Sequence, residues 1–350
     1  MLLVIIVLQH WNTNEYALTP GDATPVAPLV KVEGLSTNAH PDRILLTDVY
    51  LSTVTAWQWI VLHFQSHVEF VPAADLVSPG IPTAELSAQG FLEMSDSQQA
   101  AEVAALRALG WRVPAIPDGA IVTAVAVPSP AWRAGVSVAD RLVGVDGRRV
   151  TTSCGVVSAV HGFAPGTAVR LSVERSRISA SGVITWSAPR NVSVTTATPH
   201  AQGPSACPGA AGRDHSWLGL SLEGGVNFVL PGAITINTAN IGGPSAGLAM
   251  TLTLINKLSA GSLTGHRIVA ATGTIDAAGQ VGDVGGVAEK TVAVQRAGAR
   301  VFLVPSVEVA TARAAARPGL TIIGVTTLRG ALRALRALGG ATPVPLTRPH

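Results

Sequence analysis

The stretch Ile241–Met250 reads IGGPSAGLAM and decides the interpretation of this 350-residue chain. Its two glycines form a turn with close backbone access, and Pro244 suits the first position of a helix. The apolar run that follows predicts a helix from Ser245 to about Leu258. Unpaired backbone N–H groups at a helix start favour negative charge. Ser245 is therefore either a nucleophile beside an oxyanion site or an ordinary residue of a helix start.

A second stretch, Gly273–Lys290, reads GTIDAAGQVGDVGGVAEK. Its Gly-Gly turn leads into a predicted helix that places Lys290 one turn inside. Of 24 basic residues only Lys31, Lys257 and Lys290 are lysines. Arginine cannot lose its proton in a protein, whereas burial can lower the pKa of a lysine until it accepts one. Lys290 is thus a candidate general base, and a solvated surface lysine is the alternative.

Strands and helices alternate from residue 216 to residue 340, which predicts an α/β domain. The expected strands are 233–237, 267–271, 301–304 and 320–325, and the expected helices are 245–258, 287–297, 307–316 and 328–338.

Together the two stretches resemble the proteolytic domain of the Lon family, over residues 216–340. The GPSAG core around Ser245 and the pattern G.V..VGG..EK that ends at Lys290 occur in the family's order, and residues 297–305 also fit. Many Lon enzymes carry an acidic residue three positions before the serine, where this chain has Gly242. An acidic orienting group is therefore not expected there.

The resemblance implies that Ser245 is the nucleophile and Lys290 the general base. It also implies that Thr272 is the threonine that hydrogen-bonds the catalytic lysine, and that Gly243 and Pro244 support the serine turn. Lon proper couples this domain to an ATPase, but the chain has no GxxxxGK[ST] loop. We therefore expect an ATP-independent enzyme with no cofactor and no metal.

Residues 111–185 resemble a bacterial PDZ domain. Strands are predicted at 120–127 and 167–173; between them, Ser129–Val136 reads SPAWRAGV and Asp140–Gly147 reads DRLVGVDG, ending in an Asp-Gly turn. The resemblance implies capture of an extended peptide, often by its C-terminus. A small β-barrel without a ligand is the alternative, and no residues are assigned to a carboxylate-binding loop.

The expected fold class is α+β and multidomain, with a β-rich N-terminal segment, a PDZ-like β-barrel domain and an α/β Lon-type domain. A helix is predicted at 97–109. The expected segments are an N-terminal segment with a possible anchor remnant (1–34), an N-terminal α+β region (35–110), the PDZ domain (111–185), a linker or irregular connection (186–215), the proteolytic domain (216–340) and a tail (341–350).

The apolar run Leu2–Leu8 is shorter than the roughly 20 residues that span a bilayer. It is either a buried strand or the end of a membrane helix. The order of segments resembles bacterial PDZ-containing Lon-like proteases. That resemblance implies a single-pass protein of the cell membrane with its catalytic domain outside the cytoplasm, and the Lon-type domain implies a homo-oligomeric ring.

Composition excludes other classes. With 47% hydrophobic and 13% charged residues the chain is not disordered. A net charge of +3 and 4% aromatic residues argue against nucleic acid as a partner. Cys154 and Cys207 lie in different expected segments, so we expect two unpaired thiols, with a disulfide as the alternative.

The predicted function is serine endopeptidase activity on polypeptide substrates, with the PDZ domain engaging the client. One alternative is a non-catalytic PDZ scaffold. Another is an α/β-hydrolase esterase that uses the GxSxG motif, but only His266 and His350 follow Ser245. His266 precedes the candidate acids Asp276 and Asp283. A His-Asp-Ser protease would need His63 or His67, which have no supporting motif.

Overall fold

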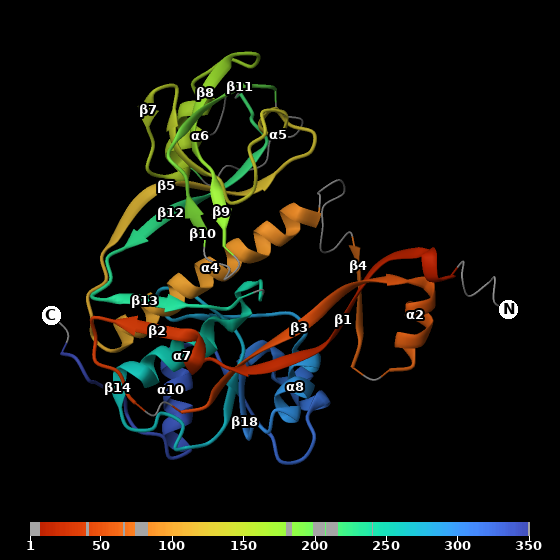
Figure 1. Cartoon of the computed structure of the whole chain (residues 1–350), viewed down its shortest axis with the longest axis vertical. Helices are drawn as coiled ribbons and strands as arrows, with labels where there is room; N and C mark the ends of the chain where they lie inside the picture. The colour runs from red at the N-terminus through yellow and green to blue at the C-terminus, as the bar shows by residue number, and fades with distance from the viewer. Residues whose placement is uncertain are drawn as a thin grey trace. The chain divides into compact units, whose positions relative to one another are not determined.

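The computed structural model describes residues 8–39, 42–65, 67–73, 83–179, 184–198, 207, 216–239 and 241–348. The chain forms two compact units (Figure 1). Unit 1 comprises Met1–Pro79, Asp96–Val113 and Leu230–His350, and unit 2 comprises Gly80–Ser95 and Pro114–Val229. The protein is a multidomain chain of mixed α and β structure, as the sequence predicts.

Unit 1 is built on a six-stranded sheet that joins both ends of the chain. Three of its strand pairings are parallel and two are antiparallel, and both antiparallel pairings are made by β1. Parallel strands are covered on both faces, which fits their unbroken apolar runs. In sheet order the strands are β19 (Thr321–Val325), β18 (Val301–Pro305), β15 (Val269–Ala271), β3 (Ile44–Thr55), β1 (Asn12–Pro25) and β4 (Glu69–Pro72).

Helices of unit 1 bury apolar faces against this sheet. The core on one face joins Leu45, Ala270 and Phe302 of the strands to Val294 and Ala312 of two helices. The helices and turns are α2 (Ala56–His63), α4 (Thr83–Ala108, which begins in unit 2), η2 (Pro244–Ala246), α7 (Gly247–Leu258), α8 (Val287–Arg296), η3 (Ser306–Glu308), α9 (Val309–Ala315) and α10 (Leu328–Ala337).

Short antiparallel pairs and one turn complete unit 1. They are η1 (Ala27–Leu29), β2 (Val30–Glu33) with β13 (Ala233–Ile236), β14 (Ser259–Ala260) with β20 (Val344–Pro345), and β16 (Thr274–Ile275) with β17 (Val281–Gly282). The β16–β17 hairpin follows directly after β15. It therefore extends from the carboxyl end of this strand, where the candidate serine turn also lies.

Unit 2 is a curved antiparallel sheet with two short helices. The Asp146-Gly147 turn has positive φ at both residues (47° and 80°), as an Asp-Gly hairpin requires. The elements are β5 (Ala115–Val125), α5 (Pro130–Arg133), β6 (Arg141–Val145), β7 (Arg148–Arg149), α6 (Ser153–His161), β8 (Ala168–Glu174), β9 (Ser176–Ile178), β10 (Ile184–Trp186), β11 (Arg190–Thr195) and β12 (Leu220–Phe228).

The expectation of two unpaired thiols is wrong. Cys154, in α6, forms a disulfide with Cys207, and the two Cα atoms lie 5.3 Å apart. The expectation failed because Cys207 was assigned to a linker separate from Cys154. In the structure β11 and β12, on either side of Cys207, both belong to the sheet of unit 2.

The compact units divide the chain at different places from the expected segments. β1 and β3, expected in separate N-terminal segments, pair with each other, and β3 also pairs with β15 of the expected proteolytic domain. The helix predicted at 97–109 is the second half of the longer α4. Leu2–Val7 lie outside the described residues. Among the helices that the structure describes, none is long and apolar enough to cross a membrane.

Candidate active site

Ser245 lies in the single turn η2, immediately before the buried helix α7. Gly243 has a φ of 85°, a left-handed conformation that glycine adopts without strain, and Pro244 occupies the first helical position. The Ser97 hydroxyl, from α4, donates a hydrogen bond to the carbonyl of Pro244 at 2.9 Å. The serine turn is therefore fixed from a second element, and Ser245 itself is half-buried.

The backbone of Ser245 is also held by the segment after β15. Its carbonyl accepts hydrogen bonds from the Gly273 amide (2.9 Å) and from the Thr272 hydroxyl (3.2 Å). The Leu248 amide in turn donates to the Gly273 carbonyl at 3.1 Å. These bonds tie the serine turn and the start of α7 to the carboxyl end of a parallel strand, which is where α/β folds commonly place ligands.

Lys290 lies in the first turn of α8, and 3% of its surface is exposed. The helix begins after Gly286, whose φ is 66°; a Cβ there would lie 2.8 Å from a methyl of Val49 on β3. Only glycine allows this approach of the helix start to the strand. Burial lowers the pKa of Lys290 to about 8, because desolvation disfavours the charged ammonium.

Three carboxylates affect the pKa of Lys290. The charges of Glu308, Asp48 and Glu289 raise its pKa, but by less than burial lowers it. Burial likewise raises the pKa of each of these carboxyl groups. Glu308 Oε1 accepts a hydrogen bond from the Val284 amide at 2.7 Å, just before the Gly-Gly turn, while its Oε2 is buried without a hydrogen-bond partner. In the described part of the chain, no ion pair involves Lys290.

Some of the predicted site residues contact each other directly. Others are connected only because their elements pack against β3. Thr272 contacts the backbone of Ser245, and both η2 and α8 pack against β3. Among the described residues no hydrogen bond links the Ser245 hydroxyl to Lys290 or Lys290 to Thr272. No motif in the sequence marks Ser97 or Glu308, because a helical serine and a helix-start glutamate look like many others.

The alternative histidines lie elsewhere. The His266 side chain is 89% exposed and approaches Asp42 at 3.8 Å, and His63 stacks on Trp59. Asp276 accepts hydrogen bonds from amides of its own loop, those of Ala278 and Gln280. His350 lies outside the described residues. Among the described residues, His266, His63 and Asp276 form no hydrogen bond or ion pair with Ser245.

Comparison with protein families matches two parts of the chain. Residues 107–181 match the PDZ domain, and residues 235–335 match the Lon protease (S16) C-terminal proteolytic domain. The chain therefore combines a part that matches PDZ domains with a part that matches the Lon-type proteolytic domain, and this combination supports a protease with a PDZ domain. Its proteolytic part is of the Lon type, a family of serine-type peptidases.

Two solved structures are also similar to part of the chain. One is the PDZ domain of the SdrC-like protein from Listeria monocytogenes, with 14% identity and a TM-score of 0.22, covering 30% of this chain and 87% of that one. Another is the second domain of the Listeria protein Lin2157, with 18% identity and a TM-score of 0.22, covering 30% and 83%. No curated protein sequence matches.

Proposed function

We propose that the protein is an ATP-independent serine endopeptidase in which Ser245 is the nucleophile and Lys290 the general base. The observation that carries this proposal is the position of Lys290, buried on a helix that packs against β3, as the serine turn also does. This burial lowers the pKa of Lys290 to about 8. At neutral pH about a tenth of such a lysine is neutral and able to accept a proton. A surface lysine would be almost fully protonated.

In the proposed reaction, Ser245 Oγ attacks the scissile carbonyl carbon while its proton passes to Lys290 Nζ. Backbone N–H groups of the serine turn stabilise the oxyanion. The C–N bond then breaks, and the leaving amine takes the proton from Lys290. Water, deprotonated by Lys290, hydrolyses the acyl-enzyme and restores the Ser245 hydroxyl. Thr272 keeps the serine turn in place and is proposed to orient Lys290 as well.

The PDZ domain is proposed to engage an extended segment of the client by adding it as a strand to an exposed sheet edge. This role is separate from bond cleavage, so it affects which polypeptides are cleaved. A membrane anchor and a ring-shaped oligomer stay predictions from the family resemblance.

The proposal is tested by peptide cleavage with purified protein, with and without ATP, beside Ser245→Ala. We expect cleavage that ATP does not stimulate and a loss of about a thousandfold or more in Ser245→Ala, because the nucleophile is removed. Ser52→Ala, at an exposed position on β3, is the matched control and should retain full activity. Cleavage that persists in Ser245→Ala would show that this residue is not the nucleophile.

A further inference from the structure

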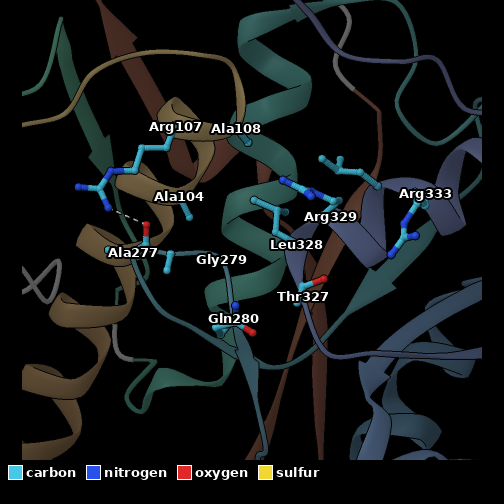
Figure 2. A pocket seen from close by; sticks show the side chains of 12 residues that line it. Ala104, Arg107, Ala108, Ala277, Gly279, Gln280, Thr327, Leu328, Arg329 and Arg333 are labelled. Carbon is cyan, nitrogen blue, oxygen red and sulfur yellow. Dashed lines mark hydrogen bonds between the residues drawn. The ribbon is translucent and has the colours of Figure 1, made fainter.

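A groove of about 730 Å³ lies in unit 1 between the end of α4, the start of α10 and the tip of the β16–β17 hairpin. Figure 2 shows Arg107 on one side and Arg329 and Arg333 on the other, with Gly279 and Gln280 between them. All three arginines line the same hollow.

The groove is strongly basic. Three arginines and no acidic residue line it. Arg107 is oriented by carbonyl groups: it donates to Ala277 at 3.0 Å and to Val113 at 3.1 Å. Arg329 and Arg333 are exposed and four residues apart, so they lie on the same face of α10. Within the described residues neither of these two forms an ion pair.

The nearest acid on the hairpin does not neutralise the groove. Asp276 Oδ1 accepts hydrogen bonds from the Ala278 amide (2.9 Å) and the Gln280 amide (2.8 Å), which turns its charge toward its own loop. The remaining lining includes the apolar side chains of Ala104, Leu328 and Leu332. A ligand here would find apolar surface as well as guanidinium donors.

The hairpin segment that lines the groove also holds the serine turn in place. Leu328, at the start of α10, donates its amide hydrogen to the Gly279 carbonyl at 2.8 Å. The same hairpin begins after Gly273, whose amide donates to the Ser245 carbonyl at 2.9 Å. One short segment, residues 273–282, therefore forms a wall of the groove and holds the candidate nucleophile's backbone.

We propose that this groove is an exosite that binds an acidic stretch of a polypeptide substrate. Guanidinium groups bind carboxylates through charge-assisted, often bidentate hydrogen bonds, and the apolar lining suits the carbon chains between them. Inorganic phosphate would leave that apolar lining unused. Nucleic acid is a poor fit because no aromatic side chain lines the groove. The inference rests on the proposed peptidase function, which supplies the polypeptide.

Binding is measured separately from cleavage, in the full chain carrying Ser245→Ala. Fluorescence anisotropy compares a labelled peptide of alternating Glu and Ala with its Gln-for-Glu counterpart. We expect the acidic peptide to bind about tenfold or more tightly, and the preference to disappear in Arg329→Glu/Arg333→Glu. Arg336→Glu is the matched control, because it lies exposed on α10 but outside the groove, and it should keep the preference.

Equal binding of the two peptides, or an equal loss in Arg336→Glu, would overturn the exosite. Complete competition by millimolar inorganic phosphate would overturn it as well, by showing a simple anion site. In the active protein, the double substitution should raise KM for a substrate with an acidic extension and leave kcat unchanged. If binding follows this pattern but no peptide is cleaved, the proposed function fails, while the groove stands as a binding site for acidic peptides.

Discussion

Lys290 and Lys257 belong to the same unit, but their ammonium groups lie at opposite ends of helices and have different neighbours. Burial lowers the pKa of both lysines. Lys257 lies in the last turn of α7 and donates to the Val30 carbonyl, where a helix C-terminus favours a cation. Lys290 lies in the first turn of α8, where the helix dipole disfavours a cation, and carboxylates act on it. A lowered pKa alone therefore does not identify a base; the surroundings of the ammonium separate the two.

The largest expected difference is in activity. Lys290→Arg should reduce kcat/KM for peptide cleavage by about a thousandfold, because arginine keeps the charge but accepts no proton. Lys290→Ala should be equally inactive. Lys257→Arg should retain activity, because a guanidinium can also donate to the Val30 carbonyl.

The test measures steady-state kcat/KM on one peptide for Lys290→Arg, Lys290→Ala and Lys257→Arg. Circular dichroism of each variant checks that it is folded. If Lys290→Arg were active, the positive charge alone would be sufficient for activity, and the general-base role of Lys290 would be wrong.

The second expected effect is on pH dependence. The neutral form of Lys290 is the active one, and its pKa is about 8. Below that pH, kcat/KM should fall about tenfold for each pH unit as the ammonium form predominates, and above it the rate should level off. A pH–rate profile with a peptide free of titratable groups measures this. A profile that is flat from pH 6 to 9 would contradict a lysine base.

A smaller effect is expected from Glu308, whose charge raises the pKa of Lys290. Glu308→Gln removes the charge, while the amide oxygen can still accept from Val284. The acid limb of the pH–rate profile should therefore move to lower pH, and cleavage at pH 7 should rise a few-fold. Glu33→Gln, at an exposed position on β2, is the control and should leave the limb in place. An unmoved limb in Glu308→Gln would exclude electrostatic tuning by Glu308.

The sequence predicted the parts of this site that depend on local pattern. The turn at Gly243 and Pro244 and the helix that carries Lys290 follow from glycine, proline and apolar spacing, and the structure places them as expected. The carboxylate contact of Glu308 and the contact of Ser97 with the serine turn were not predictable, because each depends on long-range packing. The pairing of β3 with β15, which joins the N-terminal strands to the C-terminal ones in one sheet, was missed for the same reason.

The last effect concerns stability, and the changes at the two lysines should differ in sign. An ammonium with a pKa of about 8 in the folded state and 10.5 when unfolded costs roughly 3 kcal/mol of folding free energy below pH 8. Lys290→Met removes that cost and should raise the free energy of unfolding at pH 7 by roughly 2 kcal/mol, with activity lost. Lys257→Met leaves the Val30 carbonyl without its hydrogen-bond donor. This substitution should lower the free energy of unfolding by roughly 1 kcal/mol.

Urea unfolding of both variants between pH 7 and 10.5 separates these contributions. Because the unfolded chain binds the extra proton, the stability that depends on Lys290 should rise with pH from about 8 to 10.5, and this rise should be absent in Lys290→Met. If Lys290→Met instead destabilises the protein as Lys257→Met does, Lys290 is a structural lysine like Lys257. An increase in stability paired with a loss of cleavage is what a functional lysine produces, because its buried charge is kept at the expense of the fold.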